Sequence, residues 1–539
     1  MLSFSLLYPE GKEPKFNTLS TETCNDLSIE YMVEQITQSD YEQTVIMRMM
    51  TKLVSDPEII RYRCDIFDDI IRFPSLRERI EQLLEELDYL KDLERSVKDN
   101  TAEPIWQLIN RLQELDVYVN CISGINESLE KNDVKSVGLK KLKDYVNSIY
   151  SESGFEFLYQ DIKELMNEVG RIRSVSLGVN LDSHMRPIEV GIVSLNDAPF
   201  SKPGVLSKFL DFAAKKSEIQ NGAHPFDGMA KIHTVGKVAG EDPLMSPLSR
   251  VVTEMLGSTV KQLKNRLNKY VNVSGYSLTK LIPEFIFFIR WAEYFCKLMD
   301  CGVKFCKPEI LELEKREIHS TGLYNFKLAV QKQQGKKIDI ITNDIEFNKE
   351  HGIYIMTGPN RGGKTTFTQA VGHLMLLAQH GLYVPAETAS VSPADNIFTH
   401  FPADENQTVN LGRLGEESKR LSEIFAVATN KSLLLFNESL ATTSFAEGLY
   451  IAMDVVKALR YLGARTVFNT HMHELAMHPE EMNALEGDMN VASLITGIHD
   501  GERSYKVFLA PPEGVSYAKD IAEKYGVTFT QLKSSIDKE

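Results

Sequence analysis

The chain has 539 residues, of which 43% are hydrophobic and 25% are charged. This balance is that of an ordinary globular protein, and it excludes collagen-like, low-complexity and wholly disordered chains. With 60 Lys and Arg residues against 75 Asp and Glu residues, the formal net charge is −15, which argues against a protein that coats nucleic acid non-specifically. At about 150 residues per domain, the length predicts three or four folding units, or one large unit with a long arm.

The cysteine pattern and the N-terminal residues predict where the protein works. Six cysteines are spread along the chain without a CxxC pair, so neither a zinc site nor a disulfide framework is expected. The N-terminal residues lack a basic segment before their short apolar stretch, and no apolar run is long enough to span a membrane. We therefore expect reduced thiols, no membrane contact and a cytoplasmic location.

Amphipathic helices are predicted in the early part of the chain. From about Leu27 to Asn132, apolar residues recur three and four positions apart between charged ones. Proline stands where several helices can begin, at Pro57, Pro74 and Pro104. Asp56 precedes the first of these prolines, in the position of a helix N-cap. We expect several antiparallel helices with short connections.

The pattern changes near Ser174. Residues 174–196 mix β-branched and turn residues in a strand-like alternation, and residues 201–240 are rich in Gly and Pro. Lysines outnumber acidic residues in the second stretch, which contains Lys202, Lys208, Lys215, Lys216, Lys231 and Lys237. A solvated loop and a contact with nucleic acid both fit this basic stretch.

A second helical block is predicted from about Met245 to Met299. Within it, one apolar stripe consists of Val260, Leu263, Leu267 and Val271. The basic residues outside this stripe are Lys261, Lys264, Arg266 and Lys269. This surface fits either a lever that meets phosphates or an ordinary solvent-facing helix.

After about Thr321 the chain reads as strand, glycine-rich turn, helix and strand, which is typical of a parallel α/β sheet. Just after the apolar run Ile353–Met356, the chain contains the pattern GxxxxGKT. Its residues are Gly358, Pro359, Asn360, Arg361, Gly362, Gly363, Lys364 and Thr365, and Thr366 follows. The backbone N–H groups of such a P-loop hold phosphate oxygens, Lys364 neutralises the outer phosphates, and the Thr365 hydroxyl binds Mg²⁺. The pattern predicts a site for ATP with Mg²⁺.

A second buried strand is predicted to end in polar residues beside this loop. In P-loop ATPases an Asp at this point supports Mg²⁺ and the following acid orients the attacking water. Here Asn437 takes the place of the Asp, so we expect Mg²⁺ to be held more weakly, while Glu438 keeps the acid. A third strand leads to His471, which is suited to sensing the γ-phosphate. A metal site formed with His473 and Glu474, or a packing role, are alternatives for His471.

Several segments, taken in chain order, resemble the MutS family. The resemblance covers five stretches of the C-terminal part, residues 357–386, 391–408, 433–448, 468–476 and 504–527. Residues 53–70 resemble the start of the family's core domain more weakly. The D-loop residues Thr443, Ser444 and Gly448 match the family, whereas Glu447 replaces its usual Asp.

The resemblance implies a multidomain fold. An all-α lever and core region with a small mixed clamp-like insertion would be followed by an α/β P-loop NTPase domain of the ABC type. The implied segments are an N-terminal segment 1–26, a helical region 27–320 with its insertion around 171–245, and an ATPase domain 321–539 ending in a helical dimerisation segment. Homodimerisation through the ATPase domains, DNA as a partner, and ATP with Mg²⁺ as cofactors are implied as well.

Two features depart from the family pattern. The chain begins almost at the helical arm, so we expect no N-terminal mismatch-recognition domain with its Phe-x-Glu wedge. Residues 410–418 occupy the region of the family's signature motif but lack its Ser-Thr-Phe, which puts contacts with a partner's nucleotide in doubt.

The sequence therefore predicts a slow MutS-like ATPase that couples nucleotide state to DNA binding in repair or recombination. The expected catalytic residues are Glu438, Lys364 and His471, and the expected metal ligands are Thr365 and Asn437. One alternative is a nucleotide-gated dimeric scaffold with negligible hydrolysis, which Asn437 favours. Another is an ABC-type ATPase that acts on branched nucleic acid or on ribosomes.

Overall fold

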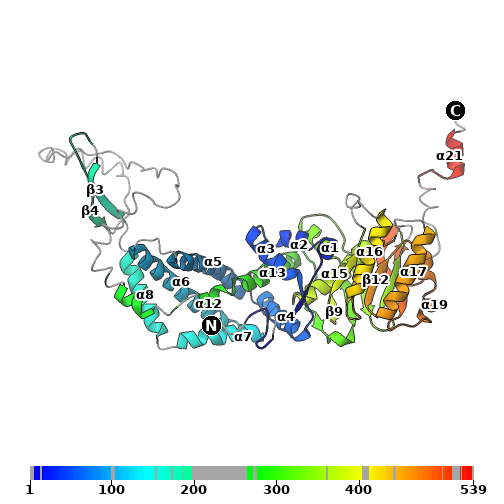
Figure 1. The fold of residues 1–539 in the computed structure, drawn as a ribbon, viewed down its shortest axis with the longest axis horizontal. Coiled ribbons are helices and arrows are strands. Elements are labelled where there is room, and N and C mark those ends of the chain that lie inside the picture. The colour runs from blue at the N-terminus through cyan, green and yellow to red at the C-terminus, as the bar shows by residue number, and fades with distance from the viewer. Residues whose placement is uncertain are drawn as a thin grey trace. The chain divides into compact units, whose positions relative to one another are not determined.

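A computed structural model describes residues 5–12, 15–98, 104–151, 154–170, 174–185, 187–196, 261, 264–270, 273, 276–359, 362–402, 412–440, 445–499, 502–512, 523 and 525–536. Figure 1 shows the elements with their labels. The chain divides into two compact units. The first comprises Met1–Glu81, Ser128–Lys143 and Leu281–Glu539, and the second comprises Gln82–Glu127 and Asp144–Lys280. The segment boundaries given by the sequence stay a prediction.

The second unit is built mainly from long helices and a hairpin. It contains parts of three helices, α5 (Pro74–Lys98), α6 (Pro104–Lys131) and α7 (Val137–Ser151), which continue into the first unit. It also contains α8 (Phe155–Gly170), β3 (Ser174–Leu181), β4 (Pro187–Asn196), η2 (Asn268–Tyr270) and α12 (Tyr276–Thr279). Strands β3 and β4 pair antiparallel, which confirms the strands predicted over residues 174–196. The basic stretch from Lys202 to Lys237 lies outside the described residues, as do Val260, Leu263 and Val271 of the predicted stripe.

Part of the predicted basic helix surface is paired with acids inside this unit. Arg266 lies 2.7 Å from the carboxylate of Asp161 and 2.9 Å from that of Glu164. Lys269 approaches the same Asp161 at 3.9 Å. Leu267 is buried, in agreement with its place on the apolar stripe. Arg266 is therefore partly neutralised, which leaves less positive charge for a phosphate.

The first unit begins with helices and two short strands. Its early elements are β1 (Phe16–Thr18), α1 (Thr21–Asp26), α2 (Ile29–Ile36), α3 (Asp40–Met50), β2 (Lys52–Val54) and α4 (Pro57–Arg72), joined later in the chain by α13 (Ile282–Asp300). Helices α4, α5 and α6 begin at the three prolines, as predicted. The Asp56 side chain accepts a hydrogen bond from the Glu58 N–H, which confirms the predicted cap.

A six-stranded sheet forms the centre of the C-terminal part of the first unit. Its order is β10-β11-β12-β8-β13-β14, and all neighbours are parallel except β13 and β14. The strands are β8 (Ile353–Thr357), β10 (Ile397–His400), β11 (Leu433–Asn437), β12 (Arg465–Asn469), β13 (Val491–His499) and β14 (Glu502–Leu509). The helices are α15 (Lys364–Gln379), α16 (Gly412–Val427), α17 (Phe445–Leu462), α18 (His473–Met477), α19 (Pro479–Asn483) and α21 (Phe529–Ile536). Fully buried strands such as β8 and β11 explain the apolar runs seen in the sequence.

The strands of a smaller mixed sheet lie before the large sheet in the chain and between its first two strands. Its order is β5-β9-β6-β7, with β5 (Glu309–Ile310), β6 (Ile318–Leu323), β7 (Asn343–Phe347) and β9 (Thr388–Val391). The short helices η3 (Leu313–Lys315) and α14 (Phe326–Gln333) lie between these strands in the chain. The architecture is multidomain, with helical regions and mixed sheets, as expected. In the part of the chain that the structure describes, no helix is both long and apolar enough to cross a membrane.

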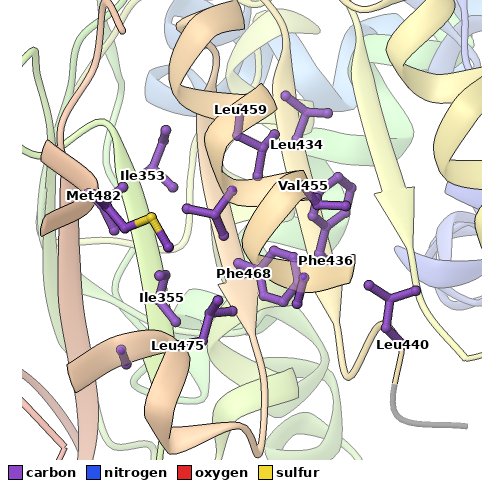
Figure 2. Close-up of a cluster of buried hydrophobic side chains, with 14 of the residues drawn as sticks. Ile353, Ile355, Leu434, Phe436, Leu440, Val455, Leu459, Phe468, Leu475 and Met482 are labelled. Atoms are coloured by element: carbon purple, nitrogen blue, oxygen red, sulfur yellow. The ribbon is translucent and has the colours of Figure 1, made fainter. Parts of the chain in front are cut away.

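Buried side chains tie the large sheet to the helices that follow its strands. The cluster includes Ile353 and Ile355 of β8, Val455 and Leu459 of α17, and Leu475 of α18. Figure 2 shows this cluster, in which the rings of Phe436 and Phe468 meet edge to face with centroids 5.5 Å apart. Leu440, just beyond β11, is fully buried in the same cluster. The core thereby anchors the backbone at the carboxyl ends of β11 and β12, which is the edge of such a sheet where ligands bind.

Candidate functional site

The glycine-rich loop, residues 358–363, joins β8 to α15. Gly358 has φ of 141° and Gly363 has φ of 95°, values that residues other than Gly rarely adopt. A Cβ atom at Gly358 would lie 2.0 Å from the hydroxyl of Thr496, and one at Gly362 would lie 2.8 Å from the carbonyl oxygen of Pro359. The loop therefore needs its glycines to lie this close to the sheet. Asn360 and Arg361, which the sequence also assigned to this site, lie outside the described residues.

Lys364 opens α15 and points into the loop. Its ammonium donates hydrogen bonds to the carbonyl oxygens of Gly358 at 3.0 Å and Pro359 at 3.2 Å. Only 4% of the residue is exposed, and burial lowers the pKa of its amine, while the charge of Glu438 acts in the opposite direction. A positive charge and the free N–H groups at the start of α15 thus occur together, an arrangement that suits an anion.

Thr365, Asn437 and Asn469 form a hydrogen-bonded group beside the loop. The Thr365 hydroxyl donates to Oδ1 of Asn437 at 2.8 Å, and Nδ2 of Asn469 donates to the same oxygen. Asn437 is 6% exposed and Asn469 is fully buried. The predicted metal ligands Thr365 and Asn437 are therefore in contact, and their oxygens are the kind of ligand that Mg²⁺ prefers.

Glu438 and His471 meet at the end of the same strands. Oε1 of Glu438 lies 2.8 Å from Nε2 of His471, and the Glu438 backbone N–H donates to the carbonyl oxygen of Asn469 at 2.8 Å. The hydrogen bond from His471 lowers the pKa of the Glu438 carboxyl, and burial opposes this shift only in part. Glu438 is consequently ionised at neutral pH, in the form that can accept a proton from water.

The backbone after β11 adopts an unusual conformation. Glu438 and Leu440 have φ of 52° and 64°, a region that costs non-glycine residues about 1–3 kcal/mol each. The carboxylate of Glu417, on α16, accepts a hydrogen bond from the Leu440 N–H at 2.7 Å. The Ser439 hydroxyl donates to the carbonyl oxygen of His400 at 3.0 Å. Helix α16 and strand β10 therefore support the backbone that carries Glu438.

A cavity of about 750 Å³ opens in front of the loop. Gly362, Gly363, Lys364, Thr365, Thr366 and Glu438 line one side of it. Apolar side chains, including Leu323, Leu328 and Ile338, line another part, together with Arg503 and Tyr505. This volume lies within the range of about 300–1,000 Å³ that is usual for small-molecule sites. Phosphates and a planar base would thus find different surroundings in one cavity.

The structure brings most of the predicted site residues together. Gly358, Pro359 and the residues 362–366 surround the start of α15, with Asn437, Glu438 and His471 next to them. The D-loop residues Thr443 and Ser444 and the signature residues 410 and 411 lie outside the described residues. Within the described residues, no group of three or more His, Cys, Asp and Glu could hold a metal ion, so the alternative metal site at His471 gains no support.

Sequence reasoning missed Asn469 and Glu417. Asn469 stands at the end of an apolar run directly before Thr470 and His471, as Asn437 stands before Glu438, and this repeated position was a usable signal. Glu417 had no such signal, because it acts on a backbone group 23 residues away.

Comparisons with known proteins match both parts of the chain. The family model for MutS domain V matches residues 354–527, and the model for the MutS2 N-terminal domain matches residues 55–301. The DNA mismatch repair protein MutS of Chlorobium chlorochromatii is 34% identical over 193 residues, which are 35% of this chain and 22% of that protein. The protein of the same name from Clostridium perfringens is 32% identical over 237 residues, 41% of this chain and 26% of its own length.

A longer match reaches across most of the chain. The DNA mismatch repair protein MSH2 of Zea mays is 25% identical over 490 residues, which are 86% of this chain and 51% of that protein. The chain thus spans about half, or less, of the length of these curated relatives. All the predicted nucleotide and metal residues fall inside the stretch that matches MutS domain V.

Proposed function

The chain belongs to the MutS family, and on that basis we propose that it binds ATP with Mg²⁺, hydrolyses ATP slowly and couples its nucleotide state to DNA binding in repair or recombination. One observation carries this proposal. The glycine-rich loop, the Lys364 ammonium, the Thr365–Asn437 oxygen pair and the Glu438–His471 pair all gather at one edge of the sheet, next to a cavity of about 750 Å³.

The residues present fit a polyphosphate with its metal. The glycines Gly358 and Gly362 let the loop pack closely against Thr496 and turn tightly, which is the backbone arrangement of a phosphate-binding loop. Thr365 and Asn437 would hold Mg²⁺, directly or through its water ligands. When bound, Mg²⁺ supplies positive charge next to the transferred phosphoryl group.

Each remaining side chain has a distinct role in the proposal. Lys364 binds the outer phosphates and stabilises the negative charge on them. The Glu438 carboxylate orients a water molecule and accepts its proton. His471 holds that carboxylate by its hydrogen bond and is within reach of a γ-phosphate that enters beside Glu438.

The test is nucleotide binding and turnover by Lys364→Ala, with Lys297→Ala as its control. Lys297 is an exposed lysine of α13 in the same unit, so its substitution removes the same positive charge at a position outside the site. We expect Lys364→Ala to lose most of the binding of ATP and ADP, because a buried polyphosphate loses its paired cation. Tight binding that survives this substitution would overturn the proposal, whereas Lys297→Ala should behave as the unchanged protein.

Asn437 favours a second candidate, a nucleotide-gated scaffold with negligible hydrolysis. An amide lends no negative charge to a metal, so ATP could persist in the site and keep a dimer closed. Steady-state phosphate release separates the two candidates, because a scaffold gives nucleotide binding without turnover. Measuring release with duplex, mismatched and branched DNA, and with ribosomes, separates DNA repair from action on branched nucleic acid or ribosomes.

Homodimerisation, DNA binding and a cytoplasmic location complete the proposal. Relatives named DNA mismatch repair proteins support DNA as the partner. We expect DNA binding to weaken with salt, because phosphate contacts release counterions. Light scattering at micromolar protein with saturating ATP tests the dimer, and only monomers under these conditions would contradict it.

A further inference from the structure

We propose that Asn469 is a positioning residue for the metal side of this site. Its amide N–H fixes the side chain of Asn437 so that the oxygen of that amide, and not its NH₂ group, faces Thr365. This inference rests on the proposed function, because it concerns the same Mg²⁺ site.

The sheet itself places the two amides together. Strands β11 and β12 are parallel neighbours, and Asn437 is the register partner of Asn469 at their carboxyl ends. Nδ2 of Asn469 donates to Oδ1 of Asn437, and the Thr365 hydroxyl donates to the same oxygen at 2.8 Å. Both asparagines are buried, so water hardly competes for these hydrogen bonds.

An asparagine needs such a neighbour where an aspartate would not. Both ends of a carboxylate are oxygens, so either end can face a hydroxyl and a cation. An amide that rotates by half a turn presents two N–H donors instead, and these repel both a donated hydroxyl proton and a positive ion. In the orientation that the structure gives it, the Asn469 amide presents its N–H to Asn437 and bonds well only to the oxygen end of that side chain, which favours the useful orientation of Asn437.

The other end of Asn469 argues that the pair does more than stabilise the fold. Oδ1 of Asn469 is buried and has no hydrogen-bond partner among the described residues. An unsatisfied buried acceptor costs about 1–3 kcal/mol. An apolar side chain at this buried position would avoid that cost, so stabilising the fold does not by itself account for an amide here.

The test measures metal affinity rather than turnover. Mn²⁺ is titrated into protein held in excess over ADP, and free Mn²⁺ is read from its EPR spectrum. We expect Asn469→Ala and the near-isosteric Asn469→Leu to weaken Mn²⁺ binding by about 10- to 100-fold, the usual effect of losing a residue that orients a metal ligand. Thr357→Val is the matched control, because Thr357 ends the adjacent strand β8 and its buried hydroxyl also lacks a partner.

The decisive comparison repeats these variants in an Asn437→Asp background. A carboxylate needs no orientation, so the change at Asn469 should then alter Mn²⁺ affinity by less than about twofold. Equal losses in both backgrounds, or unchanged affinity in Asn469→Ala and Asn469→Leu, would overturn the inference. Failure of the parent protein to bind ADP would instead overturn the proposed function, and thermal melting identifies any variant that fails to fold.

Discussion

Replacing Asn437 with Asp should accelerate hydrolysis, most clearly where Mg²⁺ is scarce. Asn437 is only 6% exposed and accepts the Thr365 hydroxyl at 2.8 Å, so the new charge would lie close to the metal and be screened little by solvent. Two unit charges about 4 Å apart attract by about 4 kcal/mol at an effective dielectric constant of about 20, and a divalent ion doubles this value. Burying the carboxylate costs several kcal/mol in return.

If burial takes back about 5–6.5 of these roughly 8 kcal/mol, a net gain of about 1.5–3 kcal/mol remains, which corresponds to roughly 10- to 150-fold in metal binding or rate. The assay is steady-state phosphate release across a Mg²⁺ titration. Asn348→Asp is the control, because it adds the same charge before β8, at the opposite end of that strand from the loop. The competing expectation is that a neighbouring carboxylate, Glu438, already compensates and would repel the new one. An Asp variant that is no faster at limiting Mg²⁺ would refute our account of Asn437.

Two further predictions concern the residues around Glu438. Glu417→Ala removes the carboxylate that accepts the Leu440 N–H and should lower turnover about tenfold. The affinity for ADP should change little, because this carboxylate supports the backbone after β11 and does not line the cavity. Glu416→Ala is the control, and equal effects of the two variants would contradict this role. His471→Ala removes the hydrogen bond that chiefly lowers the pKa of Glu438, so that pKa rises and the acid limb of the pH–rate profile should move to higher pH. An acid limb that stays in place, or moves to lower pH, would show that Glu438 is not the titrating base.

The sequence predicted local features of the fold well. The Asp56 cap, the helix starts at Pro57, Pro74 and Pro104, and the buried strands before Gly358 and Glu438 all depend on neighbouring residues, so their patterns were sufficient. The loop residues and their order also followed from a short motif.

Contacts between distant residues were not predictable in this way. Asn469 meets Asn437 because β12 pairs with β11 in one particular register, and a one-residue shift would separate the two amides. Glu417 bonds a backbone N–H, which leaves no trace in residue type. The basic residue Arg266 looked available for phosphate, yet the fold pairs it with Asp161 and Glu164.

The backbone around Glu438 bears on the choice between an enzyme and a scaffold. Left-handed backbone at Glu438 and Leu440 costs about 1–3 kcal/mol at each residue, and strain of this kind gathers at functional sites. Glu417, His400 and the buried Leu440 side chain offset that cost and direct the Glu438 carboxylate toward His471 and the loop.

If this strain serves catalysis, Glu438→Gln should lower turnover by about 100-fold or more, since a positioned general base contributes about 10²–10⁴-fold. ADP binding should persist, because the amide keeps the shape of the side chain and the phosphates are held by Lys364 and the loop. Phosphate release and ADP titration on the same preparation distinguish the outcomes. A Gln variant that binds and turns over like the parent protein would remove Glu438 as the base and leave the scaffold as the better account of this site.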